Sequence, residues 1–299
     1  MSSSTGDRSQ IPDARRWLAS RFPHRAGVIA DLRRRVGRAP APLTICPPDA
    51  SLFGRAFDIT VGLDLAHGVP YAALFDCLPD APRRVLLHAA GFAPDPANAS
   101  SGAAGWSRTA AVHPARLFAV ANVLAPMADI FRVVKVTSID HGRAIIRDQT
   151  SDLRATRIFL KLAFHARPAF RQFWDSYQVG FRDLIRGFGP VHAAPVLLDG
   201  YRQADCIAGT TSVELKTGHL TEDRHYDEII DQTLTYGLLA PLSGYPITDT
   251  AVYLARYQVL ARYPFEAVAA ELAGGALDLA DLAEELADVV RHTEHPRWI

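Results

Sequence analysis

Lysine is scarce in this chain, where only Lys135, Lys161 and Lys216 stand among 32 basic residues. Most basic positions carry arginine, so each lysine is a candidate for a position where chemistry needs a compact ammonium group. Cysteine is also scarce: three scattered residues form no C-x-x-C pair. This pattern indicates neither a disulfide framework nor a zinc knuckle.

Long apolar runs and an excess of charge of one sign are absent as well. No stretch approaches the roughly 18 apolar residues of a membrane span. The opening MSSSTGDRSQIPDARR carries no apolar run, so we expect no secretory signal and a cytoplasmic location. With 32 basic and 32 acidic residues, the net charge of zero excludes a generally basic coat for nucleic acid, although a local basic groove stays open.

What is present is an ordinary globular composition, with 48% hydrophobic and 21% charged residues in 299. A sizeable core can be buried, and the length suits one large domain or two small ones. Capping residues and apolar spacing predict several helices in the first half of the chain, and two short strands. The predicted helices are 12–22, 26–36, 53–65 and 113–131, and the predicted strands are 133–137 and 143–146.

The clearest helical pattern starts at Pro168, where aromatic residues recur along one face as far as Phe188. Such a stripe is typical of a helix that packs on a core. The period then changes to short strand-like runs, and helical spacing returns near Asp223. The later elements that we predict are strands at 195–198, 202–209 and 212–218, a helix at 223–239 ended by Pro241, a strand from 251 to 260, and helices at 265–272 and 279–290.

Three charged residues form a group whose side chains suit catalysis. Side chains two apart in a strand share a face, so Glu214 and Lys216 should point together. Asp205 precedes a predicted turn near Gly209, which could fold it alongside them. Two carboxylates suit a hard cation such as Mg²⁺, and a lysine can position water and balance charge on a phosphodiester. Neither Lys135 nor Lys161 has an acidic residue two positions before it.

The helix that follows carries Gln232 and Tyr236, one turn apart, in the only Gln-x-x-x-Tyr of the chain. An ordinary pair on a helix surface is the alternative interpretation. By contrast, no G-x-S-x-G elbow, Walker A loop or G-x-G-x-x-G fingerprint is present.

The segments ADCIAGTTSVELKTG and DQTLTYGLLAP resemble the PD-(D/E)XK nuclease superfamily, in particular its RecB-like branch with a Gln-x-x-x-Tyr helix. The resemblance implies that Asp205 and Glu214 bind the metal, that Lys216 is the catalytic lysine, and that Gln232 and Tyr236 position the substrate.

The same resemblance implies a restriction-endonuclease-like core, in which a helix at 170–188 and a helix at 223–239 flank a mixed sheet. The expected fold class is therefore α/β, with a helix-rich N-terminal region at 1–165, a nuclease core at 166–262 and C-terminal helices at 263–299.

One upstream fragment extends the resemblance. RecB-like nucleases often carry a Gly and, four residues later, a metal-binding His, and Gly54 and Asp58 have that spacing. A carboxylate can replace imidazole as a ligand, so Asp58 becomes a candidate, with a capping role as the alternative. The chain departs from the family pattern at Ala204, which replaces a proline. It also lacks an obvious acidic residue on the first core helix.

Three further acidic residues stay open as substitutes for that missing acid: Asp175, Asp183 and Asp129.

The sequence thus predicts a Mg²⁺- or Mn²⁺-dependent nuclease, a hydrolase that acts on phosphodiester bonds and has nucleic acid as its partner. DNA is preferred because the resemblance favours it, and RNA stays open, as do a protein partner and a homo-oligomer. Repair, phage defence and mobile-element biology all fit. One alternative is a catalytically inactive member of the fold that binds nucleic acid or protein. The other is a helical interaction subunit in which the match is accidental.

Overall fold

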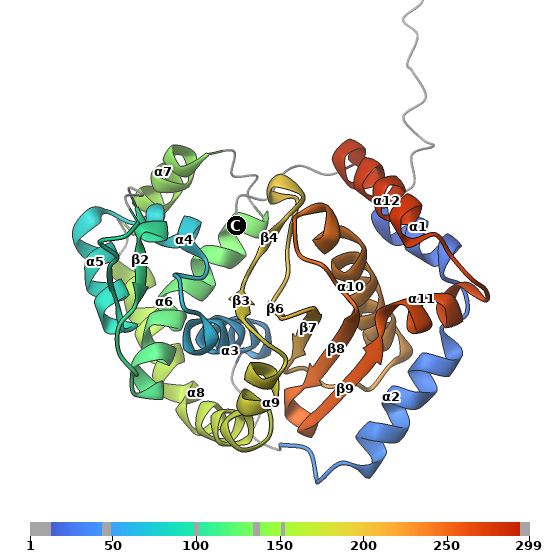
Figure 1. Ribbon diagram of the computed structural model, residues 1–299. Helices are drawn as coiled ribbons and strands as arrows, with labels where there is room; N and C mark the ends of the chain where they lie inside the picture. The colour runs from blue at the N-terminus through green and yellow to red at the C-terminus, as the bar shows by residue number, and fades with distance from the viewer. Residues whose placement is uncertain (1–12, 44–48, 99–101, 134–137, 151–152, 294–299) are drawn as a thin grey trace, which may run out of the picture.

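The computed structural model describes residues 13–43, 49–98, 102–133, 138–150 and 153–293. Within these ranges the protein is mixed α/β and mostly helical, with twelve α-helices, one five-stranded mixed sheet and two short two-stranded ribbons. The mixed sheet and the helix-rich N-terminal part agree with the sequence prediction (Figure 1).

The helices of the first half of the chain fall into two groups in space. Most of them lie on one side of the sheet, whereas the first two cross to the other side and pack near the C-terminal helices (Figure 1). They are α1 (Ala14–Arg21), α2 (Ala26–Arg38), α3 (Ala50–Leu65), α4 (Ala72–Asp76), α5 (Asp80–Ala89), α6 (Pro114–Val133), α7 (Ile139–Thr150) and α8 (Leu153–Gly180), with a small ribbon of β1 (Phe92–Pro94) and β2 (Trp106–Arg108).

The five-stranded sheet has the order β3-β6-β7-β8-β9, in which β7 and β8 are parallel and the other neighbours are antiparallel. Helix α10 connects the two parallel strands and covers one face of the sheet (Figure 1). The elements of this half are α9 (Arg182–Gly187), β3 (Val191–Ala193), β4 (Val196–Leu197), β5 (Arg202–Gln203), β6 (Cys206–Ala208), β7 (Thr211–Lys216), α10 (Asp223–Leu242), β8 (Asp249–Leu254), β9 (Val259–Pro264), α11 (Phe265–Ala273) and α12 (Leu279–Thr293).

The two faces of the sheet bury separate cores because alternate strand residues point in opposite directions. Val213 and Leu215 of β7 join the core under α3, α6 and α8. Ile207 of β6 joins the core under α10, α11 and α12, to which α1 and α2 also contribute. Helix α8 runs through the predicted boundary between residues 165 and 166.

The aromatic stripe predicted from the sequence is a buried face, as expected. Phe173 packs edge-on against Phe53 and Phe57 of α3, and Phe181 stacks on Tyr253 of β8 at 3.7 Å between ring centroids. The predicted single helix is divided into α8 and α9 at Phe181, whose backbone leaves helical geometry directly after Gly180.

Two strand predictions are wrong. Residues 143–146 belong to α7, because the Ser138 hydroxyl accepts a hydrogen bond from the His141 N–H and starts a helix there. Residues 251–260 form a β8–β9 hairpin rather than one strand, since Gln258 adopts a left-handed conformation that reverses the chain. For the strand predicted at 133–137, Val133 is the last residue of α6, and residues 134–137 lie outside the described residues.

Two boundaries also differ. The strand predicted over 202–209 is interrupted, and Ala204 and Asp205 separate β5 from β6. Helix α10 continues through Pro241 to Leu242, because a proline in the final turn removes only one helical hydrogen bond.

The β6–β7 turn depends on Gly209, which has φ +57° and lies so close to the Phe188 carbonyl oxygen that a side chain would collide with it. We expect Gly209→Ala to lower the free energy of unfolding by about 2 kcal/mol or more, through left-handed strain and this collision. Urea denaturation measures the loss. Gly37→Ala is the control, because Gly37 is exposed in α2 with nothing near its missing Cβ, and its variant should keep or gain stability. Equal stability of the two variants contradicts the role of the turn.

Candidate functional site

The β6–β7 hairpin brings Asp205 to the strand that carries Glu214. Cys206 pairs with Val213 and Ala208 with Thr211, so a two-residue loop that starts with Gly209 joins the strands. The same register places Asp205, which directly precedes β6, opposite Glu214. The hairpin expected from the sequence is therefore confirmed.

The two strands separate at Asp205. The last β6 residue paired with β7 is Cys206, yet β7 continues to Lys216. Beyond this point the Leu215 N–H donates to Asp205 Oδ2 at 2.8 Å, so a carboxylate takes the place of a neighbouring strand's carbonyl. The separation opens the sheet beside Glu214 and Lys216.

Glu214 and Lys216 lie on the same face of β7, as alternation predicts. Their side chains form an ion pair between Glu214 Oε1 and Lys216 Nζ. The Glu214 side chain is 2% exposed, whereas that of Lys216 is 28% exposed. The ammonium group therefore pairs with a buried carboxylate, while part of the Lys216 side chain stays exposed.

Helix α3 supplies Asp58 from across the opening. Gly54 lies against the residue that follows β7: a Cβ on Gly54 would come within 2.7 Å of Thr217 Oγ1. The bare glycine thus allows α3 to approach the end of β7, and Asp58 lies one turn further along the helix. Asp58 Oδ1 is buried without a hydrogen-bond partner among the described residues, which excludes a capping role for that oxygen.

Helix α10 supplies Gln232 and Tyr236 from the other side. Both residues line the same cavity as the three carboxylates and Lys216. Tyr236 is buried, and Gln232 is half-buried. All six residues singled out in the sequence are therefore gathered in one place by the fold.

The cavity has a volume of about 820 Å³ and lies between α1, α3, α10 and the strands β5 and β7. Among the described residues that line it, basic side chains are outnumbered by acidic ones, which leaves two negative charges at full ionisation. The basic residues are Arg15, Arg55, Arg202 and Lys216. The acidic residues are Asp13, Asp58, Asp205, Glu214, Glu228 and Asp231.

The carboxyl groups hold their protons more tightly than usual. Burial, together with the charge of Asp205, raises the pKa of Glu214 to about 7 and raises the pKa of Asp58 well above its ordinary value. Burial also raises the pKa of Asp205, against the lowering effect of Lys216 and the Leu215 N–H. Burial alone would lower the pKa of Lys216, but the charges of Glu214 and Asp205 raise it overall. The lysine is therefore the fixed positive charge of the site.

The donor chemistry of this cavity fits a hard divalent cation. Two buried carboxylate oxygens, Asp58 Oδ1 and Glu214 Oε2, have no hydrogen-bond partner in the part of the chain that the structure describes. Oxygen ligands of this kind are what Mg²⁺ and Mn²⁺ prefer. The side chains do not form a closed ligand set as they stand: no three His, Cys, Asp or Glu residues of the described ranges are grouped tightly enough to hold a metal ion. A cation would therefore require rotation of the carboxylates, starting from the Glu214–Lys216 pair.

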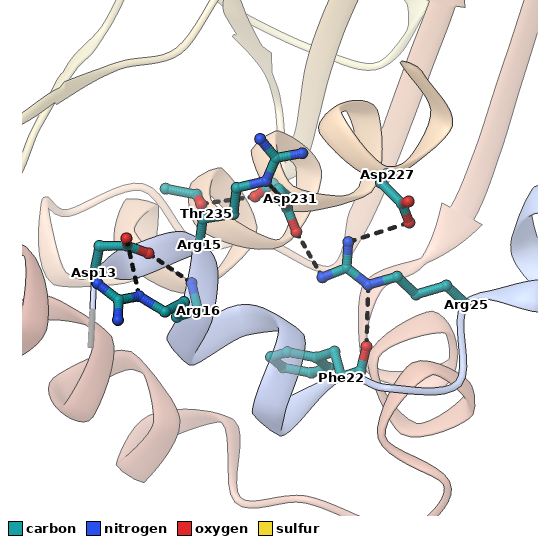
Figure 2. A network of polar contacts seen from close by, with 8 residues as sticks. All are labelled: Asp13, Arg15, Arg16, Phe22, Arg25, Asp227, Asp231 and Thr235. Atoms are coloured by element: carbon teal, nitrogen blue, oxygen red, sulfur yellow. Dashed lines mark hydrogen bonds and ion pairs between the residues drawn. The ribbon is translucent and has the colours of Figure 1, made fainter. Parts of the chain in front are cut away.

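A polar network joins α1 and the start of α2 to α10 (Figure 2), and two of its members, Arg15 and Asp231, line the cavity. Asp231 is the centre of it: Arg25 donates to Asp231 Oδ1 at 2.6 Å and to Asp227 at 3.3 Å. Arg25 also donates to the Phe22 carbonyl, and Arg15 lies 3.6 Å from Asp231 Oδ2. The network therefore anchors α10 at Asp231, the residue before Gln232, and places Arg15 at the cavity.

The three acidic residues that the sequence left open are not in the cavity wall. Asp175 and Asp183 are exposed on α8 and α9. Asp129 of α6 pairs with Arg55 at 3.4 Å. Asp129 therefore contacts a cavity-lining arginine, whereas the other two lie away from the cavity.

Sequence reasoning missed several polar residues of the wall, above all Tyr71 and the arginines at positions 15, 55 and 202. They come from α1, α3, the connection before α4, and β5. No periodic pattern or motif links Tyr71, Arg15 or Arg202 to the hairpin. Arg55 lies between Gly54 and Asp58, so that fragment was the one signal for it.

Comparison of the chain with protein-family models, with curated proteins and with solved structures finds no match. Across the described ranges, no helix combines the length and the apolar character that a membrane crossing requires.

The raised pKa of Glu214 predicts a pH-dependent stability. Between its unfolded value of 4.5 and about 7 the folded state binds the extra proton, so stability falls as pH rises through this window. The full effect above pH 7 is on the order of 3 kcal/mol. Glu214→Gln cannot ionise, so its stability relative to wild type should increase from pH 5 to pH 8 in EDTA, measured by urea denaturation.

Asp175→Asn is the matched control, since it neutralises an exposed carboxylate outside the cavity. Its stability relative to wild type should stay constant over the same pH range. If the stability of Glu214→Gln relative to wild type is equally independent of pH, then the folded protein does not raise the pKa of Glu214.

Proposed function

We propose that the protein is a divalent-metal-dependent nuclease that hydrolyses phosphodiester bonds, with DNA as the preferred substrate. One observation carries the proposal: a single cavity collects Asp58, Asp205, Glu214 and the ammonium group of Lys216, which pairs with Glu214. Carboxylates and a lysine together suit the hydrolysis of an anionic ester, because the first can hold a cation and the second can balance developing charge.

The order of elements supports membership of the PD-(D/E)XK superfamily with a restriction-endonuclease-like core. Helices α8 and α9 precede the mixed sheet that bears the acidic and lysine residues, and α10 then packs on that sheet. This is the helix, sheet and helix arrangement that the resemblance implies. Asp58 comes from α3, outside this core, as expected for the RecB-like branch.

Electrostatics explains why a cation is part of the proposal. Acidic side chains outnumber basic ones in the cavity wall, so a bound divalent ion would favour their ionised form and offset the charge that would otherwise repel a phosphate. Asp205, Glu214 and Asp58 would hold Mg²⁺ or Mn²⁺, which supplies Lewis-acid activation of the phosphate.

Residues of the chain itself would do the remaining work. Lys216 can donate hydrogen bonds to the attacking water and to the phosphate oxygen on which charge develops. The Gln232 amide can donate and accept hydrogen bonds, and Tyr236 presents an aromatic ring with a hydroxyl, so both suit the positioning of a nucleic-acid strand. The Leu215 N–H keeps Asp205 oriented towards the site.

The direct test is cleavage of single- and double-stranded DNA and of RNA in Mg²⁺ or Mn²⁺. We expect wild-type protein to cut DNA, and Lys216→Ala and Asp205→Asn to be at least about 100-fold slower. Asp175→Asn should keep wild-type activity, because this exposed residue lies outside the cavity wall. Asparagine at position 205 can still accept the Leu215 hydrogen bond, so its variant should fold.

A catalytically inactive binding module is the second candidate, and the Glu214–Lys216 ion pair favours it, because that pair satisfies the lysine without a cation. If the wild-type protein cuts no nucleic acid in either metal yet shifts the fluorescence anisotropy of labelled DNA, the binding module replaces the nuclease.

Metal binding has a readout that is independent of cleavage. Mn²⁺ at about ten times its dissociation constant should stabilise the wild-type protein by about 1.4 kcal/mol, seen as a higher melting temperature. Asp205→Asn and Asp58→Asn should lose most of this shift, and Asp175→Asn should retain it. Equal shifts in all four proteins would show that Mn²⁺ binds elsewhere.

A further inference from the structure

Tyr71 is a residue of the cavity wall to which neither the sequence motif nor the proposed mechanism assigns a role. It directly precedes α4 and adopts φ 56° and ψ 35°, in the left-handed region that residues with side chains rarely occupy. Five residues other than glycine have positive φ in the described ranges, and of these Tyr71 alone lines the cavity. Strained backbone of this kind persists where the surrounding structure fixes it, often at functional sites.

The position of the Tyr71 ring is set by a second glycine of α3. A Cβ on Gly62 would lie 3.1 Å from Tyr71 Cε2 and 3.5 Å from its hydroxyl oxygen. Gly62 follows Asp58 by four residues, as Asp58 follows Gly54, so the three share one face of α3. Gly54 leaves room for the end of β7 and Gly62 leaves room for the Tyr71 ring. Asp58 lies between these two glycines on the helix.

The Tyr71 hydroxyl is in the electrostatic field of two site carboxylates and yet is not used by the fold. None of the hydrogen bonds found among the described residues involves this hydroxyl. Burial and the charges of Asp205 and Asp58 raise the pKa of Tyr71 well above its ordinary value, so the hydroxyl keeps its proton. A phenol O–H that donates to no protein group is a donor available to a ligand.

We infer that Tyr71 is a substrate-binding residue whose hydroxyl donates a hydrogen bond to a non-bridging oxygen of the scissile phosphate. This inference rests on the proposed function, since it names the group that Tyr71 contacts in the same cavity. An anionic oxygen is the acceptor that fits, because a cation held by Asp58 and Asp205 would occupy those carboxylates and bring a phosphate into the cavity that Tyr71 lines. The bond strengthens as charge develops on that oxygen, so it acts on the rate of the chemical step.

Tyr71→Phe removes the hydroxyl and keeps the ring against Gly62, so the fold should be retained. We expect kcat for DNA cleavage in Mn²⁺ to fall by about 10- to 100-fold, as for loss of one hydrogen bond to a charged group. KM should change by less than about twofold, and the melting temperature and its Mn²⁺ shift should match those of wild type.

Tyr177→Phe is the matched control, because the Tyr177 hydroxyl donates to Asp64 at 2.7 Å and is outside the cavity wall. This variant should lose stability and keep its kcat below its melting temperature. The inference is overturned, with the nuclease intact, if Tyr71→Phe keeps wild-type kcat or changes only KM. It is overturned together with the proposed function if wild-type protein cleaves no nucleic acid.

Discussion

The candidate site depends on one local event in the sheet, the separation of β6 from β7 at Asp205. A strand that continued beside β7 would supply a backbone carbonyl to the Leu215 N–H. Instead the Asp205 carboxylate accepts the Leu215 N–H, which satisfies the exposed backbone donor and fixes the carboxylate at the opening. The same side chain therefore stands where the pairing of the two strands ends and lines the cavity of the candidate site.

The second constraint is the close approach of α3 to this opening. Large side chains at Gly54 and Gly62 would hold the helix away from Thr217 and from Tyr71. With glycine at both positions, Asp58 is carried into the cavity between them. The buried aromatic contacts of α3 with Phe173 supply the packing that holds the helix there. A rigid helix thus delivers a charged group to a place where burial makes its ionisation costly.

Burial of these carboxylates opposes stability and favours function. Their raised pKa values mean that the folded protein holds these protons more tightly than the unfolded chain does, and a divalent cation or a positively charged ligand would displace them. Lys216 offsets part of the cost, since its ammonium group pairs with Glu214. Strongly perturbed acids in a cavity are more typical of a working site than of a core built only for stability.

Local periodicity allowed the sequence to determine the hairpin, the shared face of Glu214 and Lys216, and the pairing of Gln232 with Tyr236 one turn apart. These relations depend only on the repeat of a strand or a helix, which residue order specifies directly. The sequence failed where a single turn changed the path of the chain, as at Gln258 and at the start of α7. The resemblance pointed to Asp58, but tertiary structure alone decided that Tyr71 and Arg15 meet it at one cavity, because packing between distant segments places them there and leaves no period in the sequence.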